Sequence, residues 1–375
     1  MCGFMKFHPG GEDWLLATQG TDCTESFQTH HLDFNYVQEV LKKYEVAGLA
    51  DNEPSRLSFK EDDFYCTLRK RVFEKVGKNH GPTQEMVNCI AFFTILWFLS
   101  FLLVCYLKTI WSAILSGWLM LPIWGIGHNF FHQKDTPLRF ILNITLTSSH
   151  EWRQSHAISH HHYPNSRLDA EVLGPESLFI YFCTSQKRSF VYKRLILFFL
   201  FPICSITFPI FFIKNLIFMA LRLQAFRWEY YIPLLELLFL YISSGSLLSS
   251  TYLFLAMHCT FSLMFIFITW TAHHDQDQWH DGDPLSGADR DFGRFIISST
   301  TDQSIDISLL LSLLLFSGLN DHRIHHLFPT IDRSRFNEIR TIYENTCMEF
   351  GIKTKEKPFY QLFIGWMSRL VMHTK

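Results

Sequence analysis

Most of the 19 histidines in this sequence fall into short clusters rather than being scattered along the chain. The first cluster spans residues 128–132 (HNFFH), the second spans residues 156–162 (HAISHHH) and the third spans residues 322–326 (HRIHH). Neutral imidazole is a good ligand for iron, zinc and copper. Residues three or four positions apart share one face of a helix, so each cluster can present its rings together. The spacing therefore predicts metal ligands, and we call the clusters the first, second and third histidine boxes.

The number of ligands distinguishes between metals. A catalytic zinc ion usually takes three protein ligands and one water molecule. The three boxes supply about eight imidazoles, which is enough for two ions. This excess favours two redox-active iron ions that use dioxygen over a hydrolytic zinc ion. The candidate catalytic and metal-binding residues are His128, His132, His156, His160, His161, His322, His325 and His326.

Carboxylates near the boxes are candidates for orienting the rings, because a metal-bound imidazole commonly donates its other N–H to a carboxylate. The candidates are Asp135, Glu151, Asp169, Asp275 and Asp321. Asp321 is adjacent to His322 in the sequence. Of the five carboxylates, Asp321 and Glu151 are the first that we expect to orient a ring.

Apolar runs that are long enough to cross a membrane precede and separate the boxes. Hydrophobic residues make up 48% of the chain and charged residues 18%, below the roughly 25% charged residues of soluble domains. Val87–Leu107 and Ile110–Gly127 are each close to the ~20 apolar residues that a crossing needs. Lys108 interrupts them, which predicts a helical hairpin. Basic residues crowd before the first run, so the positive-inside rule places the N-terminus and residue 128 onward in the cytosol.

The apolar stretch between the second and third boxes contains three candidate segments. They are Leu195–Ala220, Tyr231–Ser244 and Leu247–Trp270. An even number of crossings returns the chain to the cytosol, which favours crossings by the first and third segments, with the short middle one interfacial or re-entrant. A hairpin of the last two segments is the alternative. The apolar run Ile305–Leu319 is shorter than a membrane crossing needs, so we expect it to form a buried helix.

These patterns predict an all-α membrane protein with about four transmembrane helices and a cytosolic helical cap that carries the three boxes. Before the first span, Phe64, Leu68, Val72 and Val76 recur at every fourth position, as in an amphipathic helix that faces solvent or the membrane surface. The net charge of −2 gives no electrostatic reason to expect a nucleic-acid partner. The nine cysteines lack paired spacing, and the first eleven residues lack the apolar core of a cleavable signal peptide.

The order of the boxes, over residues ~85–345, resembles the membrane fatty-acid desaturase family. Residues 325–329 (HHLFP) resemble the end of the third box in the cytochrome b5-fused front-end desaturases. That group usually has glutamine where this chain has His322. Trp152 and residues 160–165 (HHHYPN) resemble the second box.

The resemblance also implies a register and one further ligand. In the second box it pairs His156 with His160 and His161 and leaves His162 as the spare ring. Related enzymes carry one more ligand on the helix before the third box. His273 falls at the matching place, with His274 as the fallback.

The N-terminus resembles the haem-binding half of cytochrome b5, through residues 8–11 (HPGG) and residues 20–31 (GTDCTESFQTHH). In that family two histidines bind the haem iron axially, which here implies His8 with His31, or with His30. A complete cytochrome b5 has a few dozen residues before this motif, whereas seven precede it here. A half-domain buries little surface, so haem b binding by this short module stays open. The pattern as a whole is most similar to insect cytochrome b5-related proteins.

The resemblance implies dioxygen-dependent oxidation of a lipid acyl chain at a di-iron centre, most often the introduction of a double bond. Electrons would come through the haem module, or from a separate cytochrome b5 or its reductase. The protein would be a multi-pass protein of the endoplasmic reticulum membrane, with its boxes and both termini in the cytosol. The implied domains are a partial cytochrome b5-like module (1–50), a linker with an amphipathic helix (51–85), a desaturase domain (86–345) and a cytosolic tail (346–375).

Three alternatives use the same boxes. The first is a lipid hydroxylase, whose ligands would be identical in kind. The second is a non-catalytic histidine-rich metal-binding protein, which is expected to carry ionisable residues inside its spans. The third is a degenerate enzyme that has kept its boxes without activity.

Overall fold

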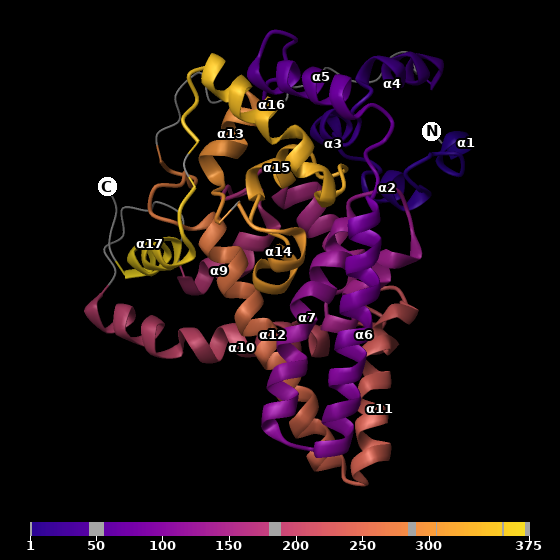
Figure 1. The fold of residues 1–375 in the computed structure, drawn as a ribbon, viewed down its shortest axis with the longest axis vertical. Helices are drawn as coiled ribbons and strands as arrows, with labels where there is room; N and C mark the ends of the chain where they lie inside the picture. Colours follow the sequence, from indigo (N-terminus) through magenta and orange to yellow (C-terminus); the bar gives the residue numbers. More distant parts are fainter. Residues whose placement is uncertain are drawn as a thin grey trace.

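The computed structural model describes residues 2–44, 56–179, 189–283, 290–304, 306–354 and 356–371. Within these ranges the chain is built from helices and turns, and the one β-pairing is an isolated bridge between Ser58 and Asp291. A bundle of long helices carries a cap of shorter ones, and the N-terminal helices lie beside that cap (Figure 1). The predicted all-α fold is confirmed.

Four of the described helices are long and apolar enough to cross a membrane. They are α6 (Gln84–Leu107), α7 (Ile110–Phe131), α10 (Phe190–Ala220, of which Arg194–Ala220 is the apolar part) and α12 (Leu247–His273). Lys108 ends α6 in a left-handed conformation, and the Thr109 hydroxyl then caps α7 by accepting from the backbone N–H of Ser112. The predicted tight hairpin and the predicted number of candidate spans are therefore confirmed.

The short apolar helix α11 (Ile232–Ser244), which follows the turn η4 (Trp228–Tyr231), runs alongside α12 and packs against α6. Figure 1 shows α10 lying across the direction of α6, α7, α11 and α12. A buried pair joins α11 to α12, with Glu236 Oε2 lying 3.3 Å from His258 Nε2. The α11–α12 pairing corresponds to the hairpin of the last two segments, the alternative of the two assignments, and α10 runs across that hairpin.

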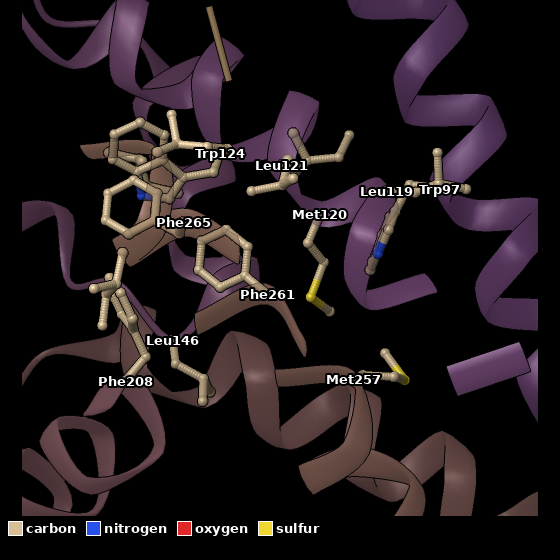
Figure 2. Close-up of a cluster of buried hydrophobic side chains, with 14 of the residues drawn as sticks. Trp97, Leu119, Met120, Leu121, Trp124, Leu146, Phe208, Met257, Phe261 and Phe265 are labelled. Atoms are coloured by element: carbon tan, nitrogen blue, oxygen red, sulfur yellow. The ribbon is translucent and has the colours of Figure 1, made fainter. Parts of the chain in front are cut away.

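Two hydrophobic cores hold the molecule together. The core of the spans packs Trp124 of α7 against Phe265 of α12, with Phe261 and Met257 further along the same helix (Figure 2). The core of the cap is centred on α5 (Phe64–Val76). The predicted periodic face of α5 is buried against α16 (Phe336–Glu349) and α13 (Phe292–Ser299). The predicted amphipathic helix is therefore confirmed, with Lys70 and Lys75 exposed on its other face, and its apolar face packs against the cap.

The remaining elements are short. A helix does precede the third box, α14 (Leu309–Phe316), but the prediction that it is buried was wrong, because Leu310, Leu311 and Leu315 are exposed; Ile305 lies outside the described residues. The others are α1 (Cys2–Met5), α2 (Glu12–Ala17), α3 (Thr24–His30), α4 (Phe34–Leu41), η1 (Lys42–Tyr44), η2 (Pro137–Thr145), α8 (Ser149–Trp152), η3 (Arg153–His160), α9 (Ala170–Phe179), α15 (His322–Leu327), η6 (Arg333–Arg335) and α17 (Phe359–Val371).

Candidate metal centre

Four separate elements bring the histidine boxes to one place. The first box ends α7, the second lies on η3, the third lies on α15, and α12 ends at His273. The nine predicted ligands meet there, and each is at most 5% exposed. Within the described residues their nitrogen atoms form two adjoining groups, which we call group A and group B.

Group A consists of His128, His132, His156, His161 and His325, whose ligand atoms all lie within 4.8 Å of one another. Nε2 of His128 lies 2.9 Å from Nε2 of His156 and 3.0 Å from Nε2 of His132. Nε2 of His161 lies 3.1 Å from Nε2 of His156. Five imidazole nitrogens therefore converge on one small volume.

Group B consists of His160, His273, His322 and His326. The ligand atoms of His160, His273 and His326 lie within 4.8 Å of one another. Nε2 of His322 lies 2.6 Å from Nε2 of His273, which adds a fourth ring. The two groups touch where the rings of His161 and His326 stack, with centroids 4.1 Å apart.

The donor set fits two metal ions. Both ring nitrogens of His326 and Nε2 of His325 are buried without a hydrogen-bond partner among the described residues. Burying such polar atoms is unfavourable unless something binds them. Nitrogen-only groups of four and five imidazoles suit iron, copper or zinc rather than magnesium or calcium.

Burial also keeps most of these rings in the form that binds metals. It lowers the pKa of His161, His325 and His326 well below the ordinary value, so their rings are neutral at physiological pH. Burial acts on His160 in the same direction, but the carboxylates of Asp169 and Glu171 outweigh it and raise the pKa of this ring. A carboxylate that accepts from the far nitrogen makes the ring a stronger donor to a metal.

Two carboxylates hold ligand rings in place. Nδ1 of His160 donates to Asp169 over 2.8 Å, and Nδ1 of His156 donates to Glu171 over 3.1 Å. Asp169 was among the five predicted carboxylates, whereas Glu171 was missed. Its sequence signal is the pair of acids two positions apart, residues 169–171 (DAE), directly after the second box.

The other four predicted carboxylates bind partners away from the rings. Asp321 pairs with Arg340 at 2.6 Å, and Glu151 accepts from Tyr230 at 2.6 Å. Asp135 binds arginines, and Asp275 binds a lysine. Adjacent residues on a helix point in different directions, so neighbours in the sequence are poor candidates for holding a ring. The expectation that Asp321 and Glu151 would orient ligands was therefore wrong.

We expect Asp169→Asn to weaken metal binding by about 10–100-fold, the usual effect of losing such a supporting carboxylate. The amide keeps the size of the side chain but loses the charge that holds the His160 N–H. Metal retained by purified protein in the presence of a competing chelator measures this effect. Glu338→Gln, on the exposed side of α16, is the matched control. Equal retention by Asp169→Asn and the wild type would contradict this role.

The neighbouring histidines point elsewhere. Nδ1 of His162 donates to the Ile158 carbonyl over 2.5 Å, and this ring belongs to neither group. Nδ1 of His274 lies 2.8 Å from Nε2 of His280, so this ring also turns away. The geometry thus agrees with the register that leaves His162 as the spare ring. It also agrees with His273, rather than His274, as the further candidate ligand.

The haem-type residues lie close together in the N-terminal helices. The rings of His8 and His31 have centroids 6.3 Å apart. Their Nδ1 atoms donate to the carbonyls of Gly11 (2.9 Å) and Phe27 (2.8 Å), which leaves each Nε2 available as a ligand. His30 instead faces Trp14, with centroids 5.1 Å apart. Of the two alternatives, the arrangement suits His8 with His31 as the residues that would hold a haem iron.

Comparisons with known proteins agree with this geometry. Residues 106–358 match the fatty acid desaturase family, and residues 1–50 match the cytochrome b5-like heme/steroid binding domain. The chain is 29% identical to the cytochrome b5-related protein of Drosophila melanogaster, over 98% of this chain and 85% of that protein. It is 26% identical to the probable Delta(5) fatty acid desaturase C of Dictyostelium discoideum (96% and 86% covered) and 24% identical to the human fatty acid desaturase 3 (94% and 82% covered). No solved structure matches the chain. The family match covers well over half of the sequence, and the chain belongs to the fatty acid desaturase family.

Proposed function

We propose that this protein is a membrane enzyme that uses dioxygen to oxidise a lipid acyl chain, introducing a double bond at a histidine-bound pair of iron ions. The observation that carries the proposal is the meeting of two all-imidazole groups at the ends of α7 and α12. Bound iron would supply the oxidation of a C–H bond by dioxygen. Haem held by His8 and His31, or a separate cytochrome b5, would supply electrons.

The chain itself orients the ligands and excludes water. Trp152 stacks on His156 with centroids 4.3 Å apart, and Trp124 stacks on His128 with centroids 4.6 Å apart. Phe265 packs against Trp124 on the membrane side of these rings. A site that begins where apolar spans end gives a lipid chain access from the bilayer while water stays outside.

Lipid profiling of cells with and without expression of the chain tests the proposal. New double bonds in cellular acyl chains are expected in expressing cells only. New hydroxylated chains would identify the hydroxylase alternative instead. Unchanged lipids in cells with well-expressed, iron-loaded protein would contradict acyl oxidation altogether.

We also propose that both termini and the cap face the cytosol of the endoplasmic reticulum membrane, since basic residues flank that side. Lys187 and Lys375, natural positions for reporter tags, lie outside the described residues. Lys60 and Lys353 are exposed on the cap, and Lys108 is exposed in the hairpin turn. Epitopes inserted after Lys60 and Lys353 should be digested by protease in intact microsomes, and one after Lys108 should be protected. Protection of only one of the two cap epitopes would contradict this topology.

A further inference from the structure

The N-terminal helices are fixed to the cap rather than tethered beside it. The backbone N–H of Asp135, just after the first box, donates to the carbonyl of Gly10 over 3.1 Å. Gly11 has a φ of 111°, and a Cβ at this position would overlap the Asp135 carboxylate. Glycine is therefore required here both by backbone conformation and by the close approach.

A second contact joins α2 to the first residue of the second-box helix. The guanidinium of Arg153, buried on η3, lies 4.3 Å from the ring centre of Trp14 and 2.9 Å from Asp135. Arg139 binds Asp13 at 3.0 Å beside it. Buried guanidinium groups are tolerated only when paired, so these acids and the indole ring stabilise the interface.

A third contact fixes α3. Arg69 of α5 donates to the carbonyl and side-chain oxygens of Gln28 at 2.8 and 2.9 Å, and lies 4.3 Å from the ring centre of Phe34. Glu25 and Thr29 on α3 are buried as a result. A segment as short as these helices buries little surface by itself, and the cap supplies the surface against which they pack.

The interface brings one ring of the module next to one ring of the second box. The rings of His30 and His162 have centroids 6.0 Å apart. The Thr29 hydroxyl lies between them, 3.1 Å from Nδ1 of His30 and 3.4 Å from Nε2 of His162. His30 adjoins His31, and His162 adjoins His161 of group A. Two rings and one hydroxyl, each ring joined to its neighbour by one peptide bond, thus link His31 of the haem-type pair to His161 of the metal groups.

We propose that His30 and His162 form the electron path between haem held by the N-terminal module and the metal centre. This inference rests on the proposed function. In each transfer one electron leaves the reduced haem and reduces the metal centre, and no bond forms or breaks along the path. A flavoprotein reductase re-reduces the haem. Two such electrons, two solvent protons and the two hydrogen atoms of the acyl chain reduce one dioxygen molecule to two water molecules.

The path can be tested on the full chain loaded with haem and iron. Haem is reduced photochemically without dioxygen while the metal centre is oxidised, and the haem absorbance band follows its reoxidation. We expect His162→Leu and His30→Leu each to slow reoxidation roughly tenfold or more, equivalent to about 1.4 kcal/mol of barrier. Haem absorbance, iron content and melting temperature should stay at wild-type values. His80→Leu, which replaces a cap histidine outside the interface, should leave the rate unchanged.

Wild-type reoxidation rates in both His162→Leu and His30→Leu would overturn the path, as would absence of haem from the wild-type chain. His162→Phe restores the packing of a ring and separates loss of the path from loss of folding: a rate between those of the wild type and His162→Leu supports the path. A wild-type rate in His162→Phe beside a slow His162→Leu of lowered melting temperature would overturn it.

Hydrogen exchange tests the docking without any cofactor. Amides of α3 should be protected in the full chain and exchange faster in Arg69→Ala. Unprotected α3 amides in the wild type would overturn the fixed interface. Lipid analysis keeps the two proposals apart. Slow haem reoxidation in His162→Leu, beside wild-type cells that make no new lipid product, would support the path and contradict the proposed function. Undiminished lipid product in His162→Leu without an external electron donor would contradict the path and support the proposed function.

Discussion

Replacing His325 or His326 with alanine is expected to abolish product formation, because the two rings belong to different metal groups. His325 is one of the five members of group A, and His326 is one of the four members of group B. Each substitution leaves one metal ion under-coordinated. Product per folded protein, measured in expressing cells or in membranes, checks this expectation.

Milder changes at neighbouring histidines provide the controls. His322→Gln should retain some activity, since related enzymes usually have glutamine at this place. His162→Ala should be milder than His160→Ala or His161→Ala, because His162 lies outside both groups. Wild-type turnover in His325→Ala or His326→Ala would show that the third box does not form the site.

Gly125→Val is expected to have the largest effect on folding. Gly125 lies on α7 one turn before His128, and a Cβ at this position would overlap the backbone carbonyl of Ser317. Ser317 ends α14 in a left-handed conformation shortly before the third box. Overpacking of this kind costs about 1–3 kcal/mol, occasionally more. The substitution should therefore lower the melting temperature of the purified protein and also reduce bound metal, by moving the third box away from the first.

Gly81→Ala is the matched control for this prediction. An added Cβ at Gly81 would meet no atom within 4 Å, so its melting temperature and metal content should equal those of the wild type. If Gly125→Val melted at the wild-type temperature with full metal content, the close approach of α7 and α14 would not exist in the folded protein.

The grouping of the histidine rings could be predicted because local spacing determines which rings share a face. His128 and His132 share a face of one helix, and the third box places its rings in the same way. The first apolar hairpin was equally clear, since Lys108 separates two runs of nearly full membrane length. The assignment of His273 came from resemblance to the family, not from spacing.

Features set by contacts between distant segments could not be predicted. Hydropathy gives α10 the composition of a span, but its direction depends on packing against α12, which composition does not encode. Glu171 reaches His156 only because the chain turns back after the second box. The role of Arg69 in holding α3 similarly depends on how α5 packs in the cap.

Elemental analysis of the purified protein tests the central claim most directly, since groups A and B predict two metal ions held by imidazole alone. We expect about two iron atoms per chain in the wild type. His325→Ala and His326→Ala should each lose about one of them, from group A and group B respectively. Carefully prepared wild-type protein that contains zinc alone, or no metal, would contradict the proposal.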